Sequence, residues 1–147
     1  MYKIPKVKVK VTISNKSSEL FQITCSKHAA EILRHLFNQD EVLWREEMLL
    51  LLLNRANKVI GYKSISDGGI AGTVCDPKVV FTTALNGTAS SIILAHNHPS
   101  GNLKPSRADE EITNKIKEGC KLLDMTLMDH IIITDDGYYS FADEGHI

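Results

Sequence analysis

The stretch SIILAHNHPSGNLKPSRAD, residues 91–109, contains the signals from which the fold of this chain can be worked out. Residues 91–95 are mostly apolar and predict a buried strand that runs directly into His96. The next segment, 99–105, has two prolines and one glycine, so an irregular connection is expected there. From Ser106 onward a helix is expected to about residue 123, because apolar residues recur on one of its faces. These residues are Ile112, Ile116, Cys120 and Leu123.

Toward the N-terminus the pattern predicts two more helices and two more strands. The continuous apolar run 48–53 is typical of a central strand that is covered on both faces. Residues 59–65 follow as its hairpin partner. Helices are expected over 26–38 and from Asp76 to about 87. The second begins with Asp76 as the N-cap and a proline at the first helical position.

Toward the C-terminus a second hairpin is expected. Residues 125–134 predict a strand, Asp136-Gly137 predicts a tight turn, and 138–141 predict the returning strand. Helices and strands thus follow one another in mixed order. This order is typical of an α/β (α+β) fold, with a mixed central β-sheet flanked by helices.

The first residues of the chain are basic and alternate in polarity. Residues 7–13 predict a half-buried strand with a lysine-rich outer face. The lysines of this region are Lys3, Lys6, Lys8, Lys10 and Lys16, and residues 1–18 contain no acidic residue. They fit a contact with phosphate or an acidic partner such as DNA, or a solvated edge strand that lysines guard against pairing. Pairing through residues 7–13 would instead make a dimer. We expect residues 1–43 to form this strand and the first helix, packed on or part of a main domain at 44–147.

Bulk composition excludes several classes of protein. The chain has 147 residues with 43% hydrophobic and 24% charged residues, as expected for one globular core, and its net charge of −1 does not demand a nucleic-acid partner. Its three cysteines, Cys25, Cys75 and Cys120, form no C-x-x-C and indicate free thiols in a reducing compartment. No signal peptide or membrane span is predicted. We therefore expect a cytoplasmic protein without a membrane partner.

His96 and His98 lie two residues apart at the end of a predicted strand. The period of a strand places both imidazoles on one face and Asn97 on the other. Asp109 falls in the first turn of the following helix, which the irregular connection can fold back over the strand end. Two histidines and one carboxylate that leave a fourth position for water are the ligand pattern of a catalytic zinc site. Taken separately, H-x-H also fits a hydrogen-bonded pair, and Ser106-x-x-Asp109 also fits a helix capping box.

The joint pattern His96-x-His98, seven residues, Ser106-x-x-Asp109 resembles the signature H-x-H-x7-S-x-x-D of the JAMM/MPN metalloproteases. AHNHPSGNLKPSRAD, Arg45-Glu46 ahead of LLLLLN, and the stretch 129–132, DHII, resemble their RadC-like branch in particular. The similarity covers about residues 26–147. It implies a cytidine-deaminase-like fold of three layers and one zinc ion per chain, held by His96, His98 and Asp109.

The resemblance also implies an activity and further site residues. It implies hydrolysis of an amide bond, in a peptide or an isopeptide, by a zinc-activated water with a glutamate on an early strand as general base. Glu46 matches that glutamate better than Glu47. Strand alternation places the two on opposite faces, so only one of them can face the metal. Ser106 matches the serine that stabilises the oxyanion. Alternatively, neither glutamate has a catalytic role, and both are solvated charges at the start of a strand.

Two further positions and one rival function stay open. Asp129 and His130 fit either outer partners of a metal ligand or a strand-end hydrogen bond. Cys75, just before a helix start, fits a thiol of lowered pKa or a small buried residue. The rival function is a DNA-repair or recombination accessory protein with a structural or vestigial metal. Full-length RadC-like proteins typically carry a helix-hairpin-helix region ahead of this domain, and residues 1–43 show no hairpin glycine pattern, so we expect no DNA contact of that kind.

Overall fold

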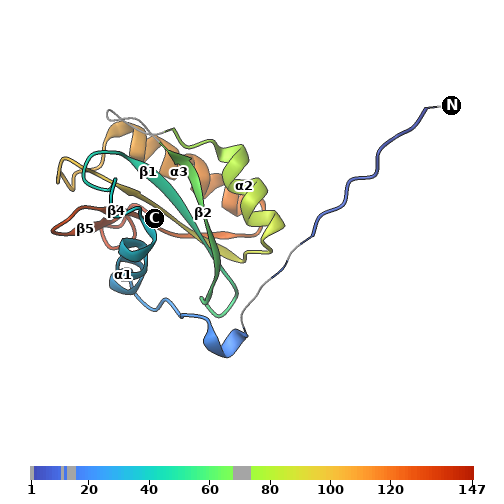
Figure 1. Ribbon diagram of the computed structural model, residues 1–147, viewed down its shortest axis with the longest axis horizontal. Coiled ribbons are helices and arrows are strands. Elements are labelled where there is room, and N and C mark those ends of the chain that lie inside the picture. Colours follow the sequence, from blue (N-terminus) through green and yellow to red (C-terminus); the bar gives the residue numbers. More distant parts are fainter. Residues whose placement is uncertain (1, 11, 13–15, 68–73) are drawn as a thin grey trace.

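The computed structural model describes residues 2–10, 12, 16–67 and 74–147. Within them the chain forms a five-stranded sheet, three α-helices and a short 3-10 helix (Figure 1). The strands are β1 (Glu47–Leu53), β2 (Val59–Asp67), β3 (Ser91–Asn97), β4 (Thr126–Ile133) and β5 (Tyr138–Ser140). The helices are α1 (Ser26–Leu36), α2 (Pro77–Asn86), α3 (Arg107–Leu122) and the 3-10 helix η1 (Ser17–Glu19).

The sheet is mixed, with the strand order β2-β1-β3-β4-β5. β3 and β4 are parallel and are joined through α3, whereas the other neighbouring pairs are antiparallel. β3 therefore lies at the centre of the sheet between β1 and β4. Each α-helix and each strand found lies close to its predicted range, the 3-10 helix η1 was not predicted, and the predicted α/β class with a mixed central sheet is confirmed.

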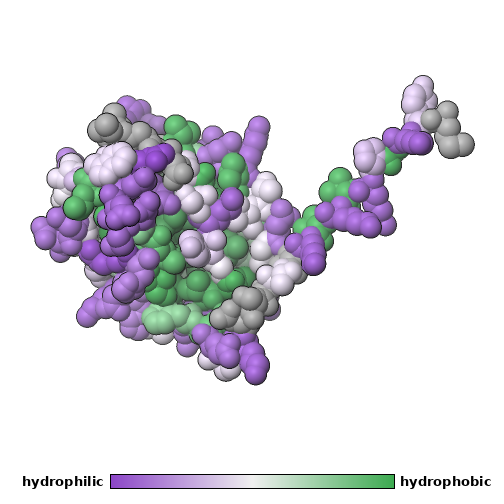
Figure 2. Space-filling view, viewed as in Figure 1, coloured by the Kyte–Doolittle hydropathy of each residue, from purple (hydrophilic) through white to green (hydrophobic). Residues whose placement is uncertain are grey.

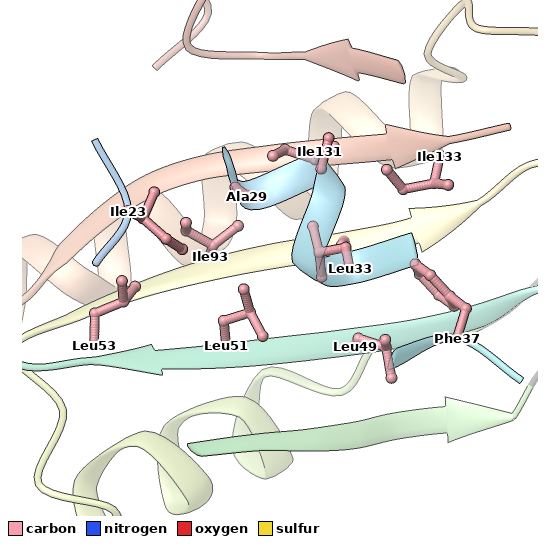
Figure 3. Close-up of a cluster of buried hydrophobic side chains, with 12 residues drawn as sticks. Ile23, Ala29, Leu33, Phe37, Leu49, Leu51, Leu53, Ile93, Ile131 and Ile133 are labelled. Carbon is pink, nitrogen blue, oxygen red and sulfur yellow. The ribbon is translucent and has the colours of Figure 1, made fainter. Parts of the chain in front are cut away.

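The helices cover both faces of the sheet, which gives three layers (Figure 1). Leu49, Leu51 and Leu53 of β1 point to one face, where they pack with Leu33 and Phe37 at the α1 side (Figure 3). The alternate residues Met48, Leu50 and Leu52 point to the other face. There they pack with Val80 and Ala84 of α2 and with Ile116 and Cys120 of α3. Because both faces are covered, β1 is apolar at consecutive positions rather than at every second one.

The strand predicted over residues 7–13 is wrong in its described part, residues 7–10 and 12, which have no regular structure. We call residues 2–10 the N-terminal arm. The arm runs away from the three layers, and hydrophilic and hydrophobic side chains lie along it in the open (Figures 1 and 2). Val7 is 86% exposed and Val9 65% exposed. Alternating polarity makes a strand only where a neighbouring strand completes the hydrogen bonds, and the arm lies beside no other described strand. Val11 and Ile13 lie outside the described residues.

α1 packs on the same sheet as the rest of the chain, through Ala29, Ala30 and Leu33. The boundary expected near residue 43 stays a prediction. Among the helices in the described ranges, none combines the length and the apolar character that crossing a membrane requires.

Candidate metal centre

Three side chains that can ligate a metal converge at the carboxyl end of β3. The Nε2 atom of His96 lies 3.2 Å from Oδ1 of Asp109, and the Nε2 atom of His98 lies 3.6 Å from Oδ2 of the same carboxylate. The two Nε2 atoms are 2.9 Å apart. One ligand atom from each residue fits within a span of 4.8 Å, so the group can hold a metal ion. The predicted residues are thus brought together.

The backbone explains why the two imidazoles share a face. β3 extends through Asn97, and the backbone N–H of His98 still donates to the carbonyl of Ile133 at 2.9 Å. The chain therefore remains extended across both histidines, and strand alternation turns Asn97 to the opposite face. There its side chain donates to the carbonyls of Val42 and Arg45. Asp109 arrives from the first turn of α3, which starts beside the end of β3.

The ring of His98 is oriented by a backbone carbonyl. Its Nδ1 lies 2.6 Å from the carbonyl oxygen of Asn102. Because a carbonyl can only accept, Nδ1 carries a proton and donates it. The neutral ring then has its lone pair on Nε2, the atom that faces Asp109. A histidine whose other nitrogen donates to a carbonyl is the usual arrangement of a metal ligand. This donor set fits a divalent transition metal.

The carboxylate and the histidines perturb one another electrostatically. Burial alone would raise the pKa of Asp109, but its contacts with His96 and His98, which donate to the carboxylate when their Nε2 atoms are protonated, outweigh burial and hold that pKa well below its usual range. The hydrogen bond to Asp109 in turn raises the pKa of His98 above its ordinary value, against the opposing effect of burial. His96 is 1% exposed, and the side chains of His98 and Asp109 are 13% and 14% exposed. The carboxylate of this group is therefore ionised, and the three side chains are largely buried.

A pocket of about 630 Å³ opens beside this group. His98 and Asp109 line it, and so do Glu46 and Ser106. Glu46 is half-buried and close enough for its charge to contribute to the raised pKa of His98. Glu47 lines a different recess, on the α1 side of the sheet, together with Asn97. The two glutamates therefore lie on opposite sides, and Glu46 is the one beside the candidate ligands.

Ser106 forms a helix capping box with Asp109, which was one of the two interpretations of the motif Ser106-x-x-Asp109. Its hydroxyl accepts from the backbone N–H of Asp109 at 3.1 Å, and its own backbone N–H donates to the Asp109 carboxylate at 2.7 Å. Accepting that bond does not use the proton of the Ser106 hydroxyl, which stays available as a donor on the pocket side. The carboxylate of Asp109 is also held in place by this box. Capping and a role in the pocket are therefore compatible.

The side chains of His130 and Asp129 make contacts in different parts of the molecule. The fully buried His130 has its Nε2 2.8 Å from Nδ1 of His96. Burial lowers the pKa of His130 well below its ordinary value, so the ring is neutral. Asp129 accepts from the backbone N–H groups of His130 and Ala142 and from the hydroxyl of Ser140. Asp129 makes no hydrogen bond with the His130 ring. The interpretation as an outer partner of a metal ligand therefore holds for His130, which contacts His96, whereas Asp129 makes the strand-end bonds.

Thr113 is a site residue that the sequence analysis missed. Its hydroxyl lies 2.6 Å from Nδ1 of His130 and donates to the carbonyl oxygen of Asp109 at 2.6 Å. The available signal was its spacing, four residues after Asp109 on the same face of α3. That signal is weak without knowing that His130 packs against this face.

Cys75 lines the pocket wall and is partly buried. Burial, together with the negative charge of Asp76, raises the pKa of Cys75 to about 11. The interpretation as a thiol of lowered pKa is therefore wrong. The helix start at Pro77 does not compensate, because burial is the larger effect on the thiolate.

Fold and site together define an α/β protein with a candidate metal centre of two histidines and one carboxylate, beside a pocket lined by a second carboxylate and a hydroxyl. The model of the RadC-like JAB domain family matches residues 23–146, and the chain belongs to this family. Membership confirms the RadC-like resemblance seen in the sequence and relates the chain to the JAMM/MPN proteins.

Curated relatives agree with this assignment. A UPF0758 protein of Flavobacterium johnsoniae is 48% identical over 127 residues, which are 86% of this chain and 54% of that protein. A UPF0758 protein of Porphyromonas gingivalis is 47% identical over 102 residues, or 69% and 45% of the two chains. One of Clostridium perfringens is 37% identical over 129 residues, or 88% and 56%. The chain thus spans about half the length of the curated relatives it matches.

Proposed function

We propose that this chain is a zinc-dependent hydrolase of the JAMM type that cleaves an amide bond in a peptide or an isopeptide. The observation that carries the proposal is the convergence of ligand atoms of His96, His98 and Asp109 within 4.8 Å. They lie beside a pocket whose lining includes His98, Asp109, Glu46 and Ser106. The family membership of the chain supports the same reaction class.

The donor set favours zinc. Two imidazole nitrogens and one carboxylate oxygen leave a coordination position open, as in catalytic rather than structural zinc sites. Zinc bound there would acidify a water molecule and polarise a substrate carbonyl. The Asp109 carboxylate beside Nε2 of His98, which raises the pKa of His98, supports a position that attracts a cation. The ligands of this site are oriented by Asn102 and by the capping box, independently of any metal.

Glu46 would act as the general base. It lines the pocket and is not one of the three grouped ligands, so its carboxylate is available to take a proton from the attacking water. It would then deliver that proton to the leaving amine. Glu47 is unsuited to the role because it lines the recess on the other side of the sheet.

Ser106 would stabilise the negative charge that develops on the substrate oxygen. Its hydroxyl proton is not used by the capping bond, so it can be donated into the pocket. The N-terminus of α3, which Ser106 caps, adds positive potential at the same place.

The test combines metal content with turnover. Protein purified without chelator should contain about one zinc per chain, and the variant His98→Ala should contain none. Peptide and isopeptide substrates should then be screened with three proteins: the natural chain, Glu46→Gln and Glu47→Gln. We expect Glu46→Gln to keep zinc and lose turnover, and Glu47→Gln to keep both. Turnover by Glu46→Gln would remove Glu46 from the mechanism. A natural chain that takes up no zinc even when it is supplied would remove the hydrolase.

A second candidate function is contact with DNA, which the exposed lysines of the N-terminal arm favour. Lys3, Lys6, Lys8 and Lys10 are all exposed along a segment that has no acidic residue. Binding through such lysines should weaken steeply with salt. Fluorescence anisotropy with labelled duplex DNA over a range of salt concentrations, for the natural chain and a variant with these four lysines changed to glutamine, tests it. Absence of binding at low salt excludes this function.

A further inference from the structure

We propose that Thr113 and His130 are positioning residues that fix the ring tautomer of His96, so that its Nε2 presents a lone pair to a metal. This inference rests on the metal site of the proposed function and extends it beyond the three ligands. It begins at the backbone carbonyl of Asp109 and is carried by three consecutive hydrogen bonds, each between atoms at 2.6–2.8 Å.

The first bond sets the direction of the others. The hydroxyl of Thr113 lies 2.6 Å from the carbonyl oxygen of Asp109. A carbonyl oxygen can only accept, so the single proton of the Thr113 hydroxyl is used in this bond. Toward any further partner the hydroxyl oxygen is then an acceptor.

The second and third bonds follow from the first. Nδ1 of His130 lies 2.6 Å from the Thr113 oxygen and must therefore be the donor. The ring of His130 is fully buried and its nitrogens contact no carboxylate, so it is neutral and carries its single proton on Nδ1. Its Nε2 has the lone pair. Nδ1 of His96, 2.8 Å away, must then carry a proton and donate it, which leaves the lone pair of His96 on Nε2.

The residues around His130 keep its ring from rotating into an orientation with other hydrogen bonds. Its ring stacks on Phe141, with the centroids 4.8 Å apart and the planes 9° from parallel. It lies between α3, which supplies Thr113, and β3, which supplies His96. A rotated ring would lose both hydrogen bonds inside the protein, where no water replaces them. The tautomer of His96 is thus decided by groups that lie outside the ligand set.

When both rings are neutral, as metal binding requires, two lone pairs are aimed at one point. Nε2 of His98 has its lone pair because Nδ1 donates to Asn102, and Nε2 of His96 has its own through His130. These atoms are 2.9 Å apart, beside the oxygens of Asp109. Two facing lone pairs repel unless a cation or a proton lies between them. Asp109 contributes twice, because its carboxylate is a candidate ligand and its backbone carbonyl accepts the first of the three hydrogen bonds. We call these bonds, from Thr113 through His130 to His96, the relay.

Removing the Thr113 hydroxyl should reverse the relay. In Thr113→Val, a variant of nearly the same shape, Nδ1 of His130 has no acceptor. The His130 proton can then move to Nε2 and be donated to Nδ1 of His96, which places the His96 proton on Nε2 and blocks that ligand atom. Outer partners of this kind change metal affinity by about 10- to 100-fold. Thr113→Ser keeps the hydroxyl and is the matched control.

The experiment has two readouts on zinc-free and zinc-titrated protein. Long-range ¹H–¹⁵N NMR of the histidine rings reports which nitrogen of His96 is protonated in the metal-free protein. A competition titration with a zinc chelator gives the affinity for zinc. We expect a proton on Nδ1 of His96 in the natural chain and in Thr113→Ser. In Thr113→Val we expect a proton on Nε2 and zinc affinity weaker by about 10- to 100-fold.

Several outcomes would overturn the inference. One is a proton on Nε2 of His96 in the natural, metal-free chain. Another is unchanged zinc affinity in Thr113→Val while circular dichroism shows a native fold. The NMR readout on the natural chain needs neither a variant nor turnover. A chain that shows this relay and binds zinc but cleaves no substrate would therefore support the inference and contradict the hydrolase.

Discussion

The side-chain oxygen of Asn97 accepts a hydrogen bond from the backbone N–H of Glu47 at 2.8 Å. The amide nitrogen of Asn97 donates to the carbonyls of Val42 and Arg45, each at 2.8 Å. One residue, lying between the two candidate histidine ligands, thus holds the backbone on both sides of Glu46. The position of the proposed base is therefore linked to the position of the ligands.

Asn97→Ala should lower turnover more than zinc affinity. The change removes three hydrogen bonds to the backbone of the segment 42–47 and should lower the free energy of unfolding by about 1–3 kcal/mol. It should also let Glu46 move, whereas His96 and His98 keep their own bonds. Urea unfolding, a zinc titration and kcat are the measurements. Asn97→Asp retains the acceptor for Glu47 but turns a carboxylate oxygen toward the carbonyls of Val42 and Arg45, so it should be at least as destabilising as Asn97→Ala. An Asn97→Ala chain with wild-type kcat would contradict the link.

The metal-free chain should lose stability as the pH rises above neutrality. The pKa of His98 is raised above 6.5 by its hydrogen bond to Asp109, so protonated His98 stabilises the folded state fully below the unfolded value of 6.5. That contribution is lost as the pH rises through the higher folded-state pKa. The lowered pKa of Asp109 acts in the opposite sense: its contribution is present above 3.8 and is lost only in acid. Thermal melts of chelator-treated protein from pH 5 to pH 9 measure this, and His98→Gln should flatten the upper part of the profile. A natural-chain profile without that fall would contradict the coupling.

Zinc should stabilise the folded chain, and a chelator should reverse the effect. Binding to the folded state alone adds about 2.7 kcal/mol when free zinc is about 100 times its Kd. Differential scanning fluorimetry with added zinc, then with excess EDTA, should show the Tm rise and return. His98→Ala should show neither change. A similar rise in that variant would mean that zinc binds elsewhere.

Asp129→Ala should weaken the fold without weakening zinc binding. Asp129 is 5% exposed and accepts three hydrogen bonds, from two backbone N–H groups and the Ser140 hydroxyl. Donors left without a partner cost about 1–3 kcal/mol of stability. Its side chain does not reach the His130 ring, so the relay to His96 should persist. Chemical denaturation tests the expected loss of stability, and a zinc titration on the same protein tests the expected unchanged zinc affinity. A large loss of zinc affinity in a folded variant would show that Asp129 acts on the site.

Cys75 should be a slow thiol at neutral pH although it lines the pocket. Its pKa is raised to about 11, so the reactive thiolate is scarce near pH 7. Iodoacetamide labelling followed by peptide mass spectrometry should find the exposed Cys25 modified first. The rate at Cys75 should climb with pH up to about 11. Equal rates at both cysteines at pH 7 would contradict the raised pKa.

Much of the site was predictable because its signals are local. His96 and His98 share a face because strand alternation sets side-chain direction over two residues, and Asp109 falls in a first helical turn because Ser106 caps that helix. The preference for Glu46 over Glu47 came from placement in a motif. The structure adds that their side chains line different recesses.

The relay was not predictable in the same way. His96 and His130 are 34 positions apart, and Thr113 and His130 are 17 apart. These contacts exist because β4 pairs in parallel with β3 while α3 covers that pair. The prediction of a strand over 7–13 was wrong for a related reason. The alternation of polar and apolar residues along the chain does not indicate whether a neighbouring strand is present.

By itself, then, the sequence determined the helices and strands from residue 26 onward, the α/β class and the three candidate ligands with the helix cap beside them. Periodicity, capping and motif spacing act over a few residues, and they can be seen in any linear stretch. The tertiary structure alone decided the strand order, the recesses that Glu46 and Glu47 line, the open N-terminal arm, and the bonds from Thr113 through His130 to His96. Those features depend on which distant segments pack together, because a hydrogen bond of 2.6–2.8 Å forms only when the sheet and the helix have brought its two atoms into place.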